Sequence, residues 1–116
     1  MIAYWYYQKG WYKEAIAEYQ RAVQLEPWRA DLYNNLGAAF NSLGEETSAV
    51  NAYRKSIEID PAYSDAHYNL SVIYWKNGEW TKVIKELKQV LQYNPNHSAA
   101  RQYLALAEQK LGRGRK

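Results

Sequence analysis

The sequence predicts an all-α protein, an α-solenoid of antiparallel helix pairs, and three observations predict it. The three prolines, at positions 27, 61 and 95, stand 34 residues apart. Four of the six glycines, at positions 10, 44, 78 and 112, keep the same spacing. Apolar residues between these marks recur with the same period. A fixed period of this length, punctuated by proline and glycine, is typical of repeat proteins built from stacked helix pairs.

The central unit, about residues 28–61, shows why each repeat contains two helices. Three apolar residues recur at helical spacing and form one stripe, which consists of Leu36, Phe40 and Leu43. We therefore expect a first helix over about residues 30–43. Gly44 suits the left-handed backbone conformation that often ends a helix.

A second helix of the central unit is expected over about residues 46–59, because a helix usually ends before a proline such as Pro61. Small residues should let the paired helices approach closely, and they are Gly37, Ala49 and Ser56. In the next unit, about residues 62–95, the larger Val83 and Val90 replace Ala49 and Ser56. We expect a somewhat wider helix pair there.

The first unit, about residues 1–27, begins in mid-pattern. When Gly10 and Pro27 are aligned with the other units, the opening residues form the last two-thirds of a first helix. Tyr6 takes the core position of Phe40, whereas Trp5 replaces Ala39 and should cover an open edge. This favours a chain cut from a longer protein over a solenoid that begins with a stub.

The last helix, expected over residues 97–111, has no partner helix after it and is interpreted as a capping helix. Its outer surface is polar, as a terminal repeat requires. The polar residues are Arg101, Gln102, Glu108, Gln109 and Lys110. The solenoid domain therefore spans residues 1–112, and residues 113–116 are expected to form a basic flexible tail.

The residues between the proline and glycine marks match a known motif. The pattern W-x2-L-G-x2-Y…A-x3-F…P is represented by Tyr33, Leu36, Gly37, Phe40, Ala49, Tyr53 and Pro61. The chain resembles the tetratricopeptide repeat family over nearly its whole length. The resemblance implies about three repeat units and a superhelix whose concave side is lined by the first helix of each unit. It also implies a non-catalytic, protein-binding role.

The predicted concave surface is the face opposite the apolar stripe of each first helix. Its candidate peptide-binding residues are Asn34, Asn35, Asn41, Asp65, Tyr68, Asn69, Trp75, Lys76 and Tyr103. Asparagine is unfavourable in helix interiors by roughly 0.6 kcal/mol relative to alanine, and its amide can pair with both groups of a peptide bond. Asn35 and Asn69 occupy equivalent positions and are expected to form two rungs along an extended peptide. The alternative is that asparagine is simply tolerated on a polar surface.

Enzymatic activity is not expected. The chain has no cysteine, and its two histidines stand apart from any nucleophile motif, carboxylate pair or metal-ligand cluster. His67 takes the packing-side position of Tyr33, and His97 follows Pro95 in a turn. We expect no cofactor and no metal site. The family's carboxylate clamp, which grips the C-terminal tail of a chaperone, also lacks its basic residues here.

Charge gives little indication of nucleic-acid binding or of a membrane partner. The net charge of +3 equals the contribution of Arg113, Arg115 and Lys116 at the C-terminus. Three lysines follow one second helix, at positions 82, 85 and 88, but Glu79 and Glu86 interrupt them. We interpret this helix face as solvated. The longest apolar run is also far shorter than the roughly 20 residues that cross a bilayer.

The sequence thus favours a module that binds a protein or peptide partner. The alternative is a scaffold that self-associates through its ends, suggested by the aromatic N-terminal edge. Neither the partner's identity nor the cellular compartment follows from the sequence.

Overall fold

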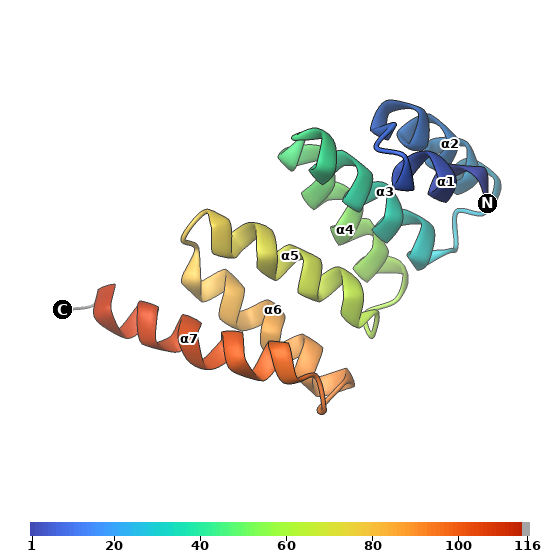
Figure 1. Ribbon diagram of the computed structural model, residues 1–116. Coiled ribbons are helices and arrows are strands. Elements are labelled where there is room, and N and C mark those ends of the chain that lie inside the picture. The colour runs from blue at the N-terminus through green and yellow to red at the C-terminus, as the bar shows by residue number, and fades with distance from the viewer. Residues whose placement is uncertain (115–116) are drawn as a thin grey trace. The chain divides into compact units, whose positions relative to one another are not determined.

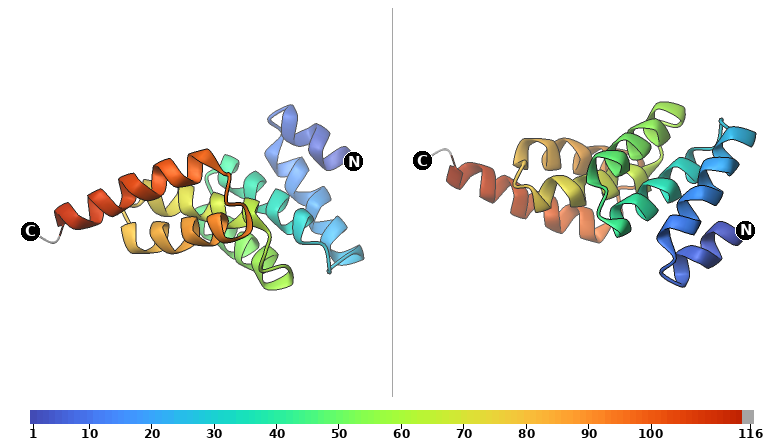
Figure 2. Two further views of the ribbon diagram at one scale, coloured as in Figure 1. Left: turned by 90° about the horizontal axis from the view of Figure 1, so that it is seen from below. Right: turned by 90° about the horizontal axis from the view of Figure 1, so that it is seen from above.

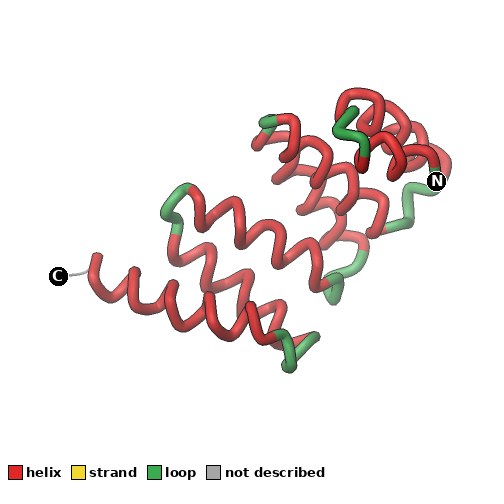
Figure 3. The backbone as a smooth tube through the Cα atoms, in the orientation of Figure 1, coloured by secondary structure: helices red, strands yellow, loops and turns green. Residues whose placement is uncertain are grey.

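The computed structural model describes residues 1–114 and, within them, contains seven α-helices and no strand (Figure 3). The helices are α1 (Ile2–Gln8), α2 (Tyr12–Leu25), α3 (Ala30–Leu43), α4 (Glu46–Ile59), α5 (Ser64–Lys76), α6 (Trp80–Tyr93) and α7 (Ser98–Gly114). The expected helices of the central unit, 30–43 and 46–59, coincide with α3 and α4. The all-α prediction is confirmed.

The chain forms two compact units that divide at a predicted repeat boundary. The first extends from Met1 to Pro61 and contains α1–α4, and the second begins at Ala62 and contains α5–α7 (Figure 1). Within each unit every helix packs against the next one along the chain. The two views in Figure 2 show this consecutive order in both units.

Glycine ends the first helix of each complete repeat as the spacing predicts. Gly44 has a φ angle of +93°, a left-handed conformation that suits glycine, and Gly10 and Gly78 share it with φ angles of +80° and +70°. The fourth glycine of the series differs. Gly112 lies inside α7, which continues to Gly114 instead of ending near residue 111. The helix therefore includes residues 113–114 of the predicted tail, and residues 115–116 lie outside the described part.

The core of the first unit joins its four consecutive helices, α1 to α4. Its buried residues are Ala3, Ala15, Ile16, Tyr19, Ala22, Val23, Leu32, Leu36, Ala39 and Ala52. Tyr6 and Phe40 are partly buried against this cluster, in keeping with the equivalent core positions expected for them. The stripe predicted for α3 was too narrow, since Leu32 and Ala39 are also buried. Because α3 packs against both α2 and α4, two of its faces are covered.

A close contact joins α3 to α4. A Cβ atom at Gly37 would stand 2.7 Å from the Tyr53 ring, so only glycine fits without movement of the ring. Tyr53 is almost fully buried, and burial raises the pKa of its phenol above the usual value. Near the other end of the pair, the buried Ser56 hydroxyl donates a hydrogen bond of 2.7 Å to the Ala30 carbonyl. Ser56 is therefore small, as the close approach of the helices requires, and it also forms a specific hydrogen bond between them.

The second unit has an apolar core with one hydrogen-bonded polar pair inside it. Its buried apolar residues are Ala66, Leu70, Ile73, Tyr74, Val83, Leu87, Val90, Ala100 and Ala107. Among them, the Glu86 carboxylate accepts a 2.7 Å hydrogen bond from His67 Nδ1, and both side chains are buried. His67 lies on the packing side as predicted. The interpretation of Glu86 as part of a solvated face was wrong, because this carboxylate points into the α5–α6 contact.

Aromatic residues of α1 and of the turn to α2 form a partly exposed cluster. Trp5 and Trp11 are 46% and 50% exposed, and their rings meet edge to face with centroids 5.4 Å apart. The Tyr6 ring contacts both, and the Lys9 ammonium lies 5.6 Å from the Trp5 ring. The two tryptophan rings are more exposed than aromatic side chains in a core, as expected for Trp5.

Candidate functional site

The nine predicted groove residues are divided between the two units. Asn34, Asn35 and Asn41 lie on α3 of the first unit. The remaining six lie in the second unit, five on α5 and one on α7: Asp65, Tyr68, Asn69, Trp75, Lys76 and Tyr103. Eight of the nine side chains are exposed or half-buried.

Asn34 is the exception, since it is only 7% exposed and already has a partner within the protein. Asn34 was predicted to lie on the open face because that face was defined as the one opposite the apolar stripe of α3. Since α2 and α4 cover α3 on two sides, the open face is narrower than this definition implies. Asn34 is therefore a structural residue in this arrangement, whereas Asn35 is half-buried and Asn41 is exposed.

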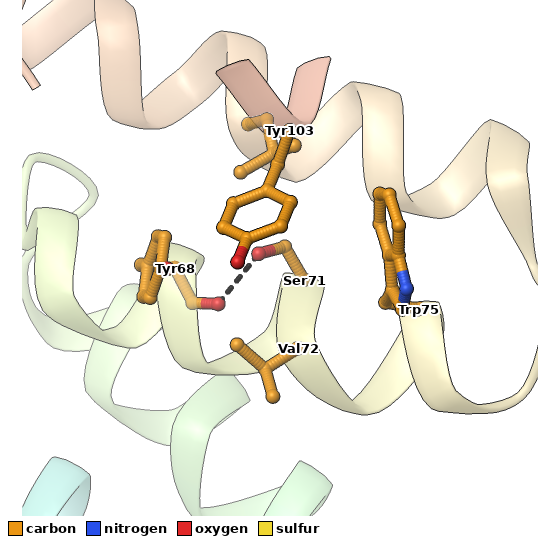
Figure 4. A pocket seen from close by; sticks show the side chains of 6 residues that line it. Tyr68, Ser71, Val72, Trp75 and Tyr103 are labelled. Atoms are coloured by element: carbon orange, nitrogen blue, oxygen red, sulfur yellow. Dashed lines mark hydrogen bonds between the residues drawn. The ribbon is translucent and has the colours of Figure 1, made fainter. Parts of the chain in front are cut away.

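Three of the predicted residues line one pocket in the second unit. Tyr68 and Trp75 of α5 stand on one side, and Tyr103 reaches toward them from α7 (Figure 4). The lining is completed by Ser71, Val72 and Leu87. The pocket has a volume of about 180 Å³ and a mainly apolar lining.

The pocket exists where the α5–α6 pair departs from the α3–α4 pair. Leu87 stands at the repeat position of Tyr53, and Ser71 stands at that of Gly37. In the first unit the Tyr53 ring fills the space beside Gly37. In the second unit the shorter leucine leaves room, and the Ser71 hydroxyl turns back to donate a 2.6 Å hydrogen bond to the Tyr68 carbonyl (Figure 4).

Aromatic contacts hold the walls of the pocket. The Trp75 ring packs edge to face against Tyr103, with centroids 5.3 Å apart, and against Trp80 at 5.1 Å. The Tyr68 ring lies 5.0 Å from the ring of His97. His97 is itself held at the start of α7, because its Nδ1 accepts a hydrogen bond from the Ala100 amide. The walls are thus fixed by α5, α6 and the segment that begins α7.

One cation stands at the rim of this pocket. The Lys110 ammonium lies 5.2 Å from the Trp80 ring and 5.9 Å from the Trp75 ring. It is seven residues after Tyr103, which places both on one side of α7. Such cation–π contacts attract an ammonium group without neutralising its charge.

Four residues of this site were not among the predicted ones: Ser71, Val72, Leu87 and Trp80. Ser71 and Leu87 occupy the motif positions of Gly37 and Tyr53, which pack the paired helices, and only the comparison of both pairs reveals the space between them. A signal existed in the simultaneous exchange of Gly37 for Ser71 and of Tyr53 for Leu87. No group of three or more potential metal-ligating side chains occurs among residues 1–114.

The fold and the repeated helix pairs define the protein as an all-α helical-repeat solenoid. Family models agree. A model described as "TPR repeat" matches residues 3–44 and 39–78, and one described as "Tetratricopeptide repeat" matches residues 64–97. The chain therefore belongs to the tetratricopeptide repeat family, as the motif predicts. A comparison with curated protein sequences gave no match.

Solved structures show the same fold. Two crystal structures of MamA are 28% identical, with TM-scores of 0.86 and 0.87 over 95% of this chain. This chain spans 60% and 64% of the length of those two MamA chains.

Two more distant structures share the fold. The first TPR of Spaghetti (RPAP3), bound to an HSP90 peptide, is 22% identical, with a TM-score of 0.87 over 95% of this chain and 89% of that one. SycD, a type III secretion translocator chaperone of Yersinia enterocolitica, is 18% identical, with a TM-score of 0.87 over 96% and 81% of the two chains.

Proposed function

We propose that this chain is a non-catalytic protein-interaction module that binds an extended peptide segment of a partner protein. The observation that carries the proposal is the pocket between α5 and α7, since three residues predicted to contact a ligand line it together. Membership of the tetratricopeptide repeat family supports an interaction role, and one relative of the same fold is described with a bound peptide.

The size of the pocket favours a side chain over a free small molecule. Sites for drug-sized ligands typically occupy about 300–1,000 Å³, whereas this one offers about 180 Å³. An apolar cavity of roughly 150 Å³ holds one benzene ring. The pocket therefore matches one aliphatic or aromatic side chain presented by a longer chain.

The peptide backbone would be held by the predicted amides. Asn35 and Asn69 are half-buried at equivalent positions of α3 and α5. Each would contribute a donor and an acceptor to the part of the bound backbone that lies along its own helix. Asp65, Lys76 and the exposed Asn41 would add polar contacts along the bound segment.

A capture experiment with matched variants tests this function. The intact chain, the Asn35→Ala/Asn69→Ala variant and Tyr103→Ala are immobilised and compared for the proteins they retain. Gln24→Ala, at an exposed position of α2, is the control. We expect the control to retain the same partners as the intact chain and the two groove variants to lose them. Retention of every partner by all variants would contradict peptide binding at these residues.

A second candidate role is a scaffold that associates with copies of itself. The exposed pair of Trp5 and Trp11 favours it, because apolar surface of this kind often marks an interaction site. Light scattering at increasing concentration tests it. We expect a rise in mass for the intact chain and none for Trp5→Ser/Trp11→Ser, and a concentration-independent monomer would exclude this role.

A further inference from the structure

We propose that the pocket selects peptides in which an apolar residue is followed or preceded, two positions away, by an aspartate or glutamate whose carboxylate pairs with Lys110. This inference rests on the proposed peptide-binding function and adds the chemical class of the ligand. It depends on three observations: the apolar pocket, the cation at its rim, and the uneven charge of the two units.

The first observation is that Lys110 carries a charge that its surroundings do not neutralise. Among the described residues its contacts are with the rings of Trp75 and Trp80, and it forms no ion pair. Lys82 provides the contrast. It also lies over a ring, that of Tyr74, but it pairs with Glu79 at 3.1 Å. Lys110 likewise lies over aromatic rings but has no carboxylate of the described residues beside it. A ligand carboxylate would supply the missing ion-pair partner.

The second observation is the position of this charge relative to the pocket. The Lys110 ammonium is 5.9 Å from the centre of the Trp75 ring, which is itself a wall of the pocket. In an extended peptide, side chains two residues apart point the same way and are separated by roughly 6.6 Å. A carboxylate two residues from the anchored side chain, on the same side of the peptide, therefore reaches the ammonium.

The third observation is the charge distribution along the chain. From Ala62 to the C-terminus the sequence has nine basic and four acidic residues, a formal charge of +5. From Met1 to Pro61 it has six basic and eight acidic residues, a formal charge of −2. Of the four acids in the second unit, Glu86 is buried and Glu79 pairs with Lys82. The part that contains the pocket is thus the part that attracts an acidic segment.

The carboxylate is assigned to a side chain and not to the end of a peptide. Recognition of a terminal carboxylate requires several converging donors, because that group presents two oxygens with no adjoining chain to position it. Lys110 alone stands over the two tryptophan rings. An internal aspartate or glutamate, positioned by the anchored neighbour and by the backbone, needs only this one cation.

Selection from a random peptide library tests the proposal directly. Twelve-residue peptides, displayed so that their C-terminus is joined to a carrier, are panned against the intact 116-residue chain. We expect leucine, methionine or phenylalanine with an acidic residue two positions away. Enrichment of basic peptides, or of apolar residues with no neighbouring acid, would overturn the acidic part of the inference.

A double-mutant cycle then assigns the acid to Lys110. The best peptide and its Glu→Gln or Asp→Asn analogue are titrated against the intact chain and against Lys110→Gln, with the tryptophan fluorescence as readout. We expect the analogue to bind about threefold to fivefold more weakly to the intact chain, the size of a partly exposed ion pair, and equally well to Lys110→Gln. Lys85→Gln, on the exposed face of α6, should retain the full difference. A difference that persists in Lys110→Gln would refute the assignment.

Two further comparisons separate the alternatives. Synthetic peptides with a free and an amidated C-terminus should bind equally, and a loss on amidation would identify a terminal carboxylate as the ligand instead. Leu87→Tyr, which restores the larger side chain of the first repeat pair, and Tyr103→Ala should each weaken binding at least tenfold, with circular dichroism to confirm folding. If neither weakens it, peptide binding at this pocket fails as a whole, whereas loss of the acid preference alone leaves the proposed function intact.

Discussion

The α3–α4 and α5–α6 pairs occupy equivalent places in the repeat but fill their contact in different ways. In the first pair, Tyr53 packs its ring against Gly37. In the second, the corresponding residues are Leu87 and Ser71, and a pocket opens beside them. The backbone period is kept in both, so the difference arises from side chains alone.

A second exchange separates the same two pairs. Tyr33 and Ala52 of the first pair correspond to His67 and Glu86 of the second, where a large ring and a small residue are replaced by a buried, hydrogen-bonded polar pair. The comparison teaches that one repeat backbone accepts either an apolar or a polar contact at this position. The two residues at this position must change together, since a buried carboxylate without its hydrogen-bond partner is costly.

The largest expected effect comes from breaking the His67–Glu86 pair. His67→Tyr leaves the Glu86 carboxylate buried beside a larger ring, and we expect the free energy of unfolding to fall by about 3 kcal/mol or more. Adding Glu86→Ala recreates the residues of the α3–α4 pair and should recover most of that loss. Urea titrations of both single variants and the double variant measure the coupling. Additive losses would show that the two pairs are not interchangeable.

A smaller but still severe effect is expected at Gly37. Gly37→Leu forces atoms into the Tyr53 ring, which is buried and cannot move away, so we expect a loss of about 3 kcal/mol. Ser71→Ala, at the equivalent position of α5, removes only a local bond and should change stability by less than about 0.5 kcal/mol. Thermal unfolding of both variants ranks them. If Ser71→Ala proved the more harmful, the close-contact assignment would be wrong.

Combining substitutions makes this second test sharper. Tyr53→Leu in the Gly37→Ser background gives α3–α4 the residues found in α5–α6. We expect Gly37→Ser alone to destabilise and the added Tyr53→Leu to relieve the overlap, although the smaller leucine leaves space of its own. No relief from Tyr53→Leu would indicate that the neighbouring backbone, and not the ring, limits the size of residue 37.

The smallest effect concerns the far end of the first pair. Ser56→Ala keeps the small size that the close approach of the helices favours but leaves the Ala30 carbonyl without this hydroxyl donor. We expect a loss of about 1 kcal/mol, the usual value for one buried neutral hydrogen bond. Val90 holds the equivalent position in α6 without such a bond, and Val90→Ala serves as the comparison for size alone. A change within error for Ser56→Ala in chemical denaturation would make small size its only role.

Most of the fold could be predicted because its signals are local. Gly44 and Pro61 mark helix boundaries by their own conformational restrictions, and α3 and α4 have the expected bounds for that reason. The last helix was predicted too short because Gly112 was assigned the role of the other glycines. Gly112 lies inside α7 and is not among the glycines with a positive φ angle, and a helix tolerates glycine at a cost of about 1 kcal/mol.

The site was predictable only in part because it depends on pairs of residues from different helices. Tyr68, Trp75 and Tyr103 could be identified from their place on the open faces of α5 and α7. Glu86 could not, because its role is set by His67 on the neighbouring helix. The residue pattern of one helix does not show which residues of a neighbouring helix pack against it. Asn34 was misplaced for the same reason.

The position of Tyr103 has a consequence for how the pocket responds to local unfolding. The main contacts of α7 are with α6, so its opening should cost less free energy than unfolding of the whole unit. Each such opening removes one wall of the pocket and one cation from its rim. A ligand that contacts α5 and α7 together binds only the closed form, and it must therefore slow the exchange of α7 amide hydrogens in proportion to its occupancy. The fraction of time for which α7 stays closed over the pocket therefore depends on the occupancy of the bound partner.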